Sequence, residues 1–219
     1  MSAEMSIRGL IFDFGGVLWN MRWDVSLELE RAHGLRERAI VETLYGNGAW
    51  RQIEVGEGDR EAWLRDAHVQ LESLAGRALP PLHQHWRERQ HAIVPNIELV
   101  RALRPPYRTA VLSNADVTLP ERLRANGLWE LFDDVVCSAE VRLAKPEPRI
   151  YALAAERLGL AAAECVFIDD LESNVEAARA TGMHGVHFRV DRGDDLAAQL
   201  AELGVTPRRE QDRRVPEEV

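Results

Sequence analysis

The 219-residue sequence is poor in cysteine and has neither an excess of basic residues nor a long apolar run. Its two cysteines, Cys137 and Cys165, lack metal-ligand spacing, so we expect buried thiols in a reducing compartment rather than a disulfide. The net charge of −9 argues against nucleic acid as the main partner. No run is long enough to span a membrane, and Met1 to Arg8 has no signal-peptide pattern. We therefore expect a cytoplasmic protein with neither a nucleic-acid nor a membrane partner.

Five short apolar runs are typical of buried strands in a parallel sheet. They are rich in Val, Ile, Leu and Phe without clean alternation, as expected when helices cover both sheet faces. Helical segments separate them, which favours an α/β fold with a Rossmann-like parallel sheet. The capping-box spacing of Thr118 with Glu121, and of Ser173 with Glu176, predicts two helix starts. The runs are Ile7–Phe12, Thr109–Leu112, Asp134–Cys137, Cys165–Ile168 and Gly185–Phe188.

The stretch from Trp23 to Ile93 has helical periodicity and no convincing strand. It separates the first two predicted strands by far more residues than a simple crossover needs. We therefore predict an inserted α-helical cap over the carboxyl edge of the sheet. The predicted division is an α/β core at 1–20 and 94–204, a cap at 21–93 and a flexible tail at 205–219.

Polar residues follow four of the apolar runs. Asp13 ends the first run and leads into Gly15 and Gly16. A charge at the end of an apolar run is costly unless it is paired, bound to metal or used. Glycines there allow the backbone to approach a ligand closely, although a strand-capping Asp before a flexible turn is equally consistent with this segment alone. The later runs lead into Ser113-Asn114, Lys145 and Asp169-Asp170.

These residues should meet, because ligands bind beyond the carboxyl ends of parallel strands. Carboxylates, a hydroxyl and a cation at one edge suit phosphoryl transfer with Mg²⁺, which prefers oxygen ligands. The adjacent carboxylates of Asp169 and Asp170 would repel each other unless a cation were near. Taken singly, Ser113-Asn114 is also typical of a loop start, and Lys145 of a solvated lysine before a proline turn. The inference therefore depends on the whole set.

The four segments resemble, in the same order, the four motifs of the haloacid dehalogenase superfamily. The matching segments are Phe12–Leu18, Leu112–Asn114, Lys145-Pro146 and Phe167–Asn174. The insert after the first motif resembles the cap of the subgroup that includes the N-terminal phosphatase domain of soluble epoxide hydrolases and small sugar-phosphate phosphatases. The resemblance implies a haloacid dehalogenase-like core with a helical cap. It also implies a phosphatase that acts on a small phosphorylated metabolite with Mg²⁺ as cofactor.

The resemblance implies a catalytic role for several matched residues. Asp13 would attack phosphorus and become an aspartyl phosphate. Ser113 and the backbone of Asn114 would hold phosphoryl oxygens. Lys145 would neutralise charge on the nucleophile and on the transferring group.

The metal ligands implied by the resemblance include a departure from the family pattern. Asp170 would bind Mg²⁺ directly and Asp169 directly or through water, with Asp13 and the Gly15 carbonyl as further ligands. Most phosphatases of the superfamily carry a second Asp at the position of Gly15, which protonates the leaving group and later activates water. Such an acid is worth ~10²–10⁴-fold, so its loss favours substrates with good leaving groups unless a cap residue or water replaces it. We interpret the cap histidines as ordinary surface residues: His68, His83, His85 and His91.

Two other functions stay open at this stage. Gly15 is also consistent with a catalytically weak relative that binds a phosphate ligand or a partner protein without useful turnover. A metal-free 2-haloacid dehalogenase, whose carboxylate attacks carbon, would lack the second Asp as well. That enzyme class has no Asp-Asp pair in the fourth motif, and Asp169-Asp170 argues against it.

Overall fold

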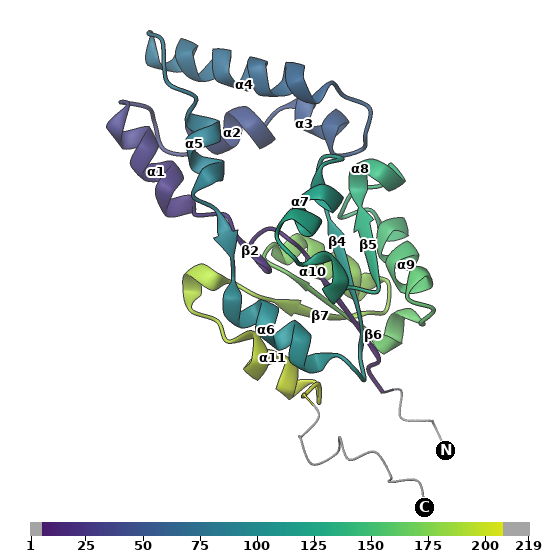
Figure 1. The fold of residues 1–219 in the computed structure, drawn as a ribbon. Coiled ribbons are helices and arrows are strands. Elements are labelled where there is room, and N and C mark those ends of the chain that lie inside the picture. Colours follow the sequence, from purple (N-terminus) through teal and green to yellow (C-terminus); the bar gives the residue numbers. More distant parts are fainter. Residues whose placement is uncertain (1–5, 208–219) are drawn as a thin grey trace, which may run out of the picture.

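The computed structural model describes residues 6–207 and has a five-stranded parallel sheet in the order β5-β4-β1-β6-β7. Helices lie on both sides of this sheet (Figure 1). The α/β fold class predicted from the sequence is confirmed, and each predicted strand agrees with the observed one to within two residues at either end. The strands are β1 (Gly9–Phe12), β4 (Arg108–Ser113), β5 (Asp134–Cys137), β6 (Cys165–Asp169) and β7 (His184–His187).

The register of the central strand brings the predicted site residues to one edge. Phe12 at the end of β1 pairs with Val111 of β4 and with Ile168 of β6. All four residues of β1 are buried, as expected for a strand covered on both faces. Asp13 therefore leaves the sheet beside the ends of β4 and β6, where the second and fourth segments begin.

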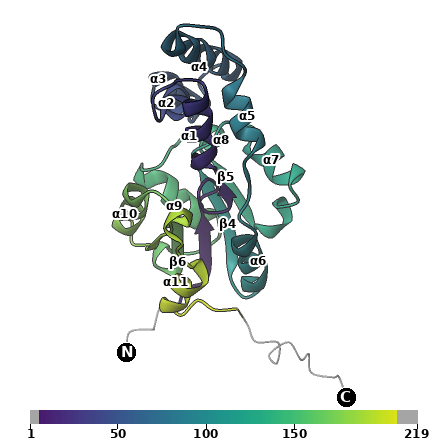
Figure 2. The ribbon, with the colours of Figure 1, turned by 90° about the vertical axis from the view of Figure 1, so that its left-hand side faces the viewer.

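Helices cover the two faces of the sheet with separate apolar cores (Figure 2). Val100, Leu123 and Leu200 pack on one face, and Tyr151 and Ala178 pack on the other. The helices of the first face are α6 (Val94–Leu103), α7 (Leu119–Ala125) and α11 (Leu196–Glu202). Those of the second face are α9 (Pro148–Arg157) and α10 (Glu172–Ala180). The remaining short turns are α8 (Ser138–Val141), η1 (Trp129–Leu131), η2 (Ala162–Glu164) and η3 (Val190–Arg192).

Five further helices form a helical region that stands over one edge of the sheet (Figure 1). It has its own apolar cluster, in which Leu44, Leu71 and Trp86 are fully buried. The chain enters through β2 (Trp19–Asn20) and leaves through β3 (His91–Ala92), and these two strands pair antiparallel. The helices are α1 (Trp23–Ala32), α2 (Ala39–Tyr45), α3 (Gly48–Ile53), α4 (Arg60–Ala75) and α5 (Leu82–Glu88).

The predicted helix start at Thr118 is confirmed and the one at Ser173 is wrong, and neither helix has the predicted capping box. Thr118 stands at the N-cap of α7, but its hydroxyl donates to the carboxylate of Asp116 and makes no cap bond. The other helix, α10, begins at Glu172 and therefore already contains Ser173. In the first case the Thr118 hydroxyl bonds Asp116 instead of the helix, and in the second the N-cap is Leu171, two residues before Ser173.

Three other local predictions need correction or completion. The strand β3 lies inside the stretch interpreted as strand-free, because two residues are too few to show a periodicity. Val205 is 2% exposed, so the packed core extends past the predicted boundary at Gly204, whereas tail residues 208–219 lie outside the described part. His83 is 6% exposed, not a surface residue, and its Nε2 lies 3.1 Å from Thr43 Oγ1.

The two cysteines are free and buried in β5 and β6, as predicted. Burial raises the pKa of Cys137 and of Cys165 to about 11, so both thiols stay protonated at neutral pH. Within residues 6–207 no helix has the length and apolar character needed to cross a membrane.

Candidate active site

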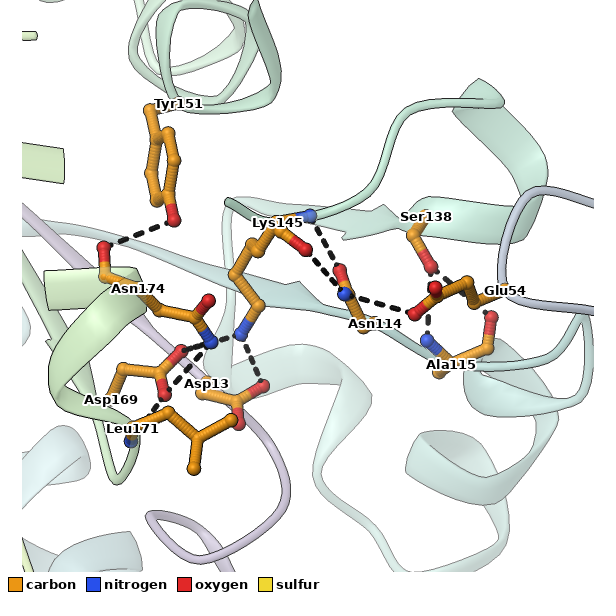
Figure 3. Close-up of polar contacts among 10 residues, drawn as sticks. All are labelled: Asp13, Glu54, Asn114, Ala115, Ser138, Lys145, Tyr151, Asp169, Leu171 and Asn174. Carbon is orange, nitrogen blue, oxygen red and sulfur yellow. Dashed lines mark hydrogen bonds and ion pairs between the residues drawn. The ribbon is translucent and has the colours of Figure 1, made fainter. Parts of the chain in front are cut away.

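A buried ion-pair cluster lies at the edge where the strands end (Figure 3). Lys145 Nζ is 2.9 Å from Asp13 Oδ1 and 2.6 Å from Asp169 Oδ2. The side chains are almost inaccessible, with residue exposures of 6% for Lys145, 8% for Asp13 and 0% for Asp169. A buried charge is costly without a partner, and here two carboxylates share one ammonium group. The cluster of Asp13, Lys145 and Asp169 therefore retains a negative charge that a cation could balance.

Burial and neighbouring charges act in opposite directions on the pKa values of Asp13 and Lys145. Burial raises the pKa of Asp13, while Lys145 and the Ser113 hydroxyl oppose this shift. Burial alone would lower the pKa of Lys145, but Asp13 and Asp169 hold it above its ordinary value. The ammonium group of Lys145 is thus charged over the whole physiological range, and it favours the ionised form of Asp13.

Asp169 is fixed by neighbours on the loop that leads into α10. Its oxygens accept hydrogen bonds from Asn174 Nδ2 at 3.2 and 3.1 Å and from the Leu171 backbone N–H at 2.8 Å. Tyr151 donates to the Asn174 carbonyl at 3.0 Å from the adjoining helix. Asn174, the last residue of the fourth segment, therefore holds the Asp169 carboxylate.

Three carboxylates converge closely enough to hold a metal ion. Asp13, Asp169 and Asp170 each present an oxygen within 4.8 Å of the other two. Burial raises the pKa of Asp170 to about 7, and the charges of Asp13 and Asp169 add to the shift. Asp13 Oδ1 accepts no hydrogen bond of good geometry although Lys145 lies beside it. Oxygen donors with excess negative charge are what Mg²⁺ prefers, so these residues fit the predicted ion.

Gly15 and Gly16 differ in how much room their neighbours leave for a side chain. Gly16 has a φ of 81°, and a Cβ there would lie 2.3 Å from Asp170 Oδ2, so a larger residue would displace that carboxylate. Gly15 has no positive φ, and a Cβ there would contact only the Met21 side chain among the described residues, at 3.4 Å. Sterically, position 15 therefore accommodates the Asp that the family usually has there.

Asn114 uses its side chain to hold the segment of Lys145. Its Oδ1 accepts from the Lys145 backbone N–H at 2.8 Å, and its Nδ2 donates to the Lys145 carbonyl at 2.9 Å. The resemblance had assigned only the backbone of Asn114, to phosphate. The side chain has the separate effect of setting where Lys145 enters the cluster.

Glu54 reaches this edge from the helical region and was missed by the sequence analysis. Its Oε2 accepts from Asn114 Nδ2 at 3.1 Å (Figure 3), and burial raises its pKa despite opposing bonds from Asn114 and Trp50. The loop that follows Glu54 packs closely against the core at Gly56. The φ of Gly56 is 72°, and a Cβ added there would lie 2.2 Å from the Ala139 carbonyl oxygen. Glu54 ends the helix α3 rather than an apolar strand, so it lacked the signal that singled out Asp13.

A cavity of about 650 Å³ lies between the sheet edge and the helical region. This volume is typical of small-molecule sites. Every predicted site residue lines it except Asp169, which is fully buried. The lining from the predicted set is Asp13, Gly15, Ser113, Asn114, Lys145 and Asp170. The aromatic lining is Phe14, Trp19, Trp23, Tyr45, Trp50 and Trp63.

Comparison with known proteins assigns the family. The model of the haloacid dehalogenase-like hydrolases matches residues 7–182, which include all four segments. The chain belongs to the haloacid dehalogenase-like hydrolases. The family predicted from the four segments is thus confirmed, and with it the assignment as a hydrolase.

Individual relatives of this hydrolase have different chemistry. Sesquiterpene phosphatase astK of Aspergillus oryzae is 28% identical over 190 residues, covering 84% of this chain and 90% of that protein. An enzyme of the family from Bacteroides thetaiotaomicron, crystallised with magnesium and inorganic phosphate, has a TM-score of 0.67 at 24% identity, covering 88% and 98%. L-2-haloacid dehalogenase from Xanthobacter autotrophicus, with chloropropionic acid covalently bound, has a TM-score of 0.63 at 24% identity. The match covers 96% of this chain and 93% of that chain. Below 25% identity, these two structures show a shared fold alone.

Proposed function

We propose that this hydrolase is a Mg²⁺-dependent phosphatase that cleaves a small phosphate monoester through an aspartyl phosphate on Asp13. The observation that carries the proposal is the cluster of Asp13, Lys145 and Asp169 with Asp170 beside it at the cavity. Three converging carboxylates, of which two share one ammonium group, are expected where a cation binds. The phosphatase relative and the family structure with magnesium and phosphate support the same reading.

The reaction would proceed in two transfers of the phosphoryl group. Asp13 attacks phosphorus, the bond to the leaving oxygen breaks, and an acyl phosphate forms. Lys145 and Ser113 offset the negative charge of the transferring group. Water then attacks phosphorus, which releases inorganic phosphate and restores the Asp13 carboxylate. Bound Mg²⁺, held by Asp13, Asp170 and the Gly15 carbonyl with Asp169 directly or through water, would neutralise charge on the phosphoryl oxygens.

Glu54 is our candidate for the acid that Gly15 lacks. Among the residues that line the cavity, it is the one carboxyl from the helical region. Its pKa, raised by burial, retains a proton to a higher pH than an ordinary Glu, and Asn114 holds it beside the second motif. Glu54 would give its proton to the leaving oxygen in the first transfer and recover one from the attacking water in the second.

The helical region would act as the cap predicted for residues 21–93. Within residues 6–207, two side-chain contacts join its helices and loops to the core, Glu54 to Asn114 at 3.1 Å and Arg60 to Asp116 at 3.0 Å. Both would break if the region swung away on the paired strands β2 and β3. Closure would exclude water from the acyl phosphate until the leaving group departs.

The test is release of inorganic phosphate from a panel of phosphorylated metabolites that includes sugar 1-phosphates and acetyl phosphate. We expect turnover with Mg²⁺ and a loss of about a hundredfold or more with EDTA, reversed by added Mg²⁺. Halide release from 2-chloropropionate in EDTA would instead favour the dehalogenase, which the cavity-lining Asp170 argues against. Binding of phosphate by the folded protein, with no turnover across the panel, would favour the catalytically weak relative.

A further inference from the structure

The cavity also contains positive charge that the proposed chemistry does not use. Arg60, Arg87 and Arg122 all line it, from α4, α5 and α7. Arg60 forms an ion pair with Asp116 at 3.0 Å. Within residues 6–207, Arg87 and Arg122 form no ion pair with an acidic side chain, and each lies over an aromatic ring instead.

The two unpaired guanidinium groups are close enough to influence each other. Burial lowers the pKa of Arg122, and the charges of Arg87 and Arg60 act in the same direction. Burial raises the pKa of Tyr45, and Arg87 and Arg122 both oppose that shift, so both lie near its hydroxyl group. Like charges that are partly removed from water repel each other, and a bound anion would relieve this repulsion.

Each of these guanidinium groups lies over an aromatic ring. Arg122 lies 5.0 Å from the ring centre of Phe14, and Arg87 lies 5.7 Å from that of Trp63. A guanidinium group held by its face still presents parallel N–H donors that match the two oxygens of a carboxylate or phosphate. Phe14 directly follows Asp13, so Arg122 belongs to the same cavity as the nucleophile.

We propose that Arg87 and Arg122 form a second anion subsite, which binds a carboxylate or phosphate at the far end of the substrate. The substrate would be an elongated phosphate ester in which an apolar body, packed on aromatic walls, separates two anionic groups. The cavity of about 650 Å³ has room for such a molecule. This inference rests on the proposed function, because it assigns the first anionic group to the site of Asp13.

Matched probes test this subsite. Alkyl phosphates of increasing chain length are compared with ω-carboxyalkyl phosphates and α,ω-bisphosphates of the same lengths, by kcat/KM for phosphate release with Mg²⁺. At the length that spans the cavity, we expect a preference of about tenfold to a hundredfold for a probe with the second anion. The carboxylate and bisphosphate arms show which anion the subsite prefers. Equal kcat/KM values at every length would overturn the proposal.

Variants of Arg87 and Arg122 test whether these two residues cause the preference for probes with a second anion. Arg122→Gln and Arg87→Gln should each lower the ratio between dianionic and alkyl probes about tenfold, and Arg122→Lys should lose less. The matched control is Arg124→Gln, because Arg124 is exposed on the same helix α7, lies over Trp129 and does not line the cavity. A ratio that stays unchanged in both Gln variants would show that the arginines only pack against rings, and would overturn the proposal.

A binding measurement separates this inference from the proposed function. Phosphonates with the same chains cannot be hydrolysed, and their binding with Mg²⁺ is measured by calorimetry. Tighter binding of the carboxylated phosphonate, lost in Arg122→Gln, would support the subsite even if no phosphate ester were turned over. Equal binding of the two phosphonates would overturn the subsite even if the protein proved to be a phosphatase.

Discussion

The sheet edge and the helical region hold buried polar groups in opposite ways. At the edge, Lys145 lies within 2.9 Å of Asp13 and 2.6 Å of Asp169, so buried charge is kept by pairing it with opposite charge. In the helical region, His83 is buried beside Thr43, and burial lowers its pKa to about 4, so it stays neutral. The helical region holds its buried polar side chains by hydrogen bonds instead: Glu30, 0% exposed, accepts from the backbone N–H groups of Arg38 and Ile40, each at 2.8 Å.

Of the variants considered, removal of the charge on Asp13 at the sheet edge should have the largest effect on activity. Asp13→Asn should lower kcat for phosphate release by about 10⁴-fold or more, because an amide cannot form the aspartyl phosphate. Asn has the same size and Lys145 keeps its partner Asp169, so the thermal midpoint should move by only a few degrees. Steady-state kinetics and calorimetry check the two parts.

The control for Asp13→Asn is a second buried carboxylate of the same cavity. Asp116 pairs with Arg60 and lies outside the cluster of Asp13, Lys145 and Asp169. Asp116→Asn should therefore cost far less turnover than Asp13→Asn. Comparable activity in Asp13→Asn and wild type would rule out the covalent mechanism.

Removal of the carboxyl group at Glu54 should have the next largest effect. Glu54→Gln should lower kcat for alkyl phosphates by about 10²-fold, since their leaving oxygens need a proton. The loss in kcat/KM, which reports the first transfer, should be much smaller for acetyl phosphate than for alkyl phosphates, because acetate leaves without protonation. The ratio of the two losses, measured with saturating Mg²⁺, distinguishes proton donation from a structural role.

Position 15 offers a complementary variant. Because a Cβ there would contact only Met21 among the described residues, Gly15→Asp is a suitable variant for introducing the acid that most of the family's phosphatases carry. Added to Glu54→Gln, it should restore a large part of the turnover of alkyl phosphates. If Glu54→Gln slowed both substrates equally and Gly15→Asp restored neither, Glu54 would position Asn114 rather than donate a proton.

The same contrast explains how much the sequence could predict. Asp13 and Asp169 were found because a carboxylate that ends an apolar strand is anomalous within a few residues of sequence, and parallel strands bring such ends together. Glu54 and Arg122 lie on elements that are far apart in the chain, and only tertiary packing brings them to one cavity. The burial of His83 likewise depends on a partner, Thr43, that lies 40 residues away.

The smallest expected effect concerns the neutral histidine of the helical region. The pKa of His83 is about 4 in the folded state against an ordinary value of 6.5, so between these pH values the unfolded chain binds a proton that the native state does not. This group alone should lower the free energy of unfolding by about 3 kcal/mol as the pH falls from 6.5 to 4.

In His83→Gln the free energy of unfolding, measured by urea denaturation, should depend less steeply on pH in that window. His85→Gln, on the same helix α5, is the control and should keep the wild-type slope. Identical slopes in His83→Gln and wild type would mean that His83 accepts a proton in place, within the packed helical region.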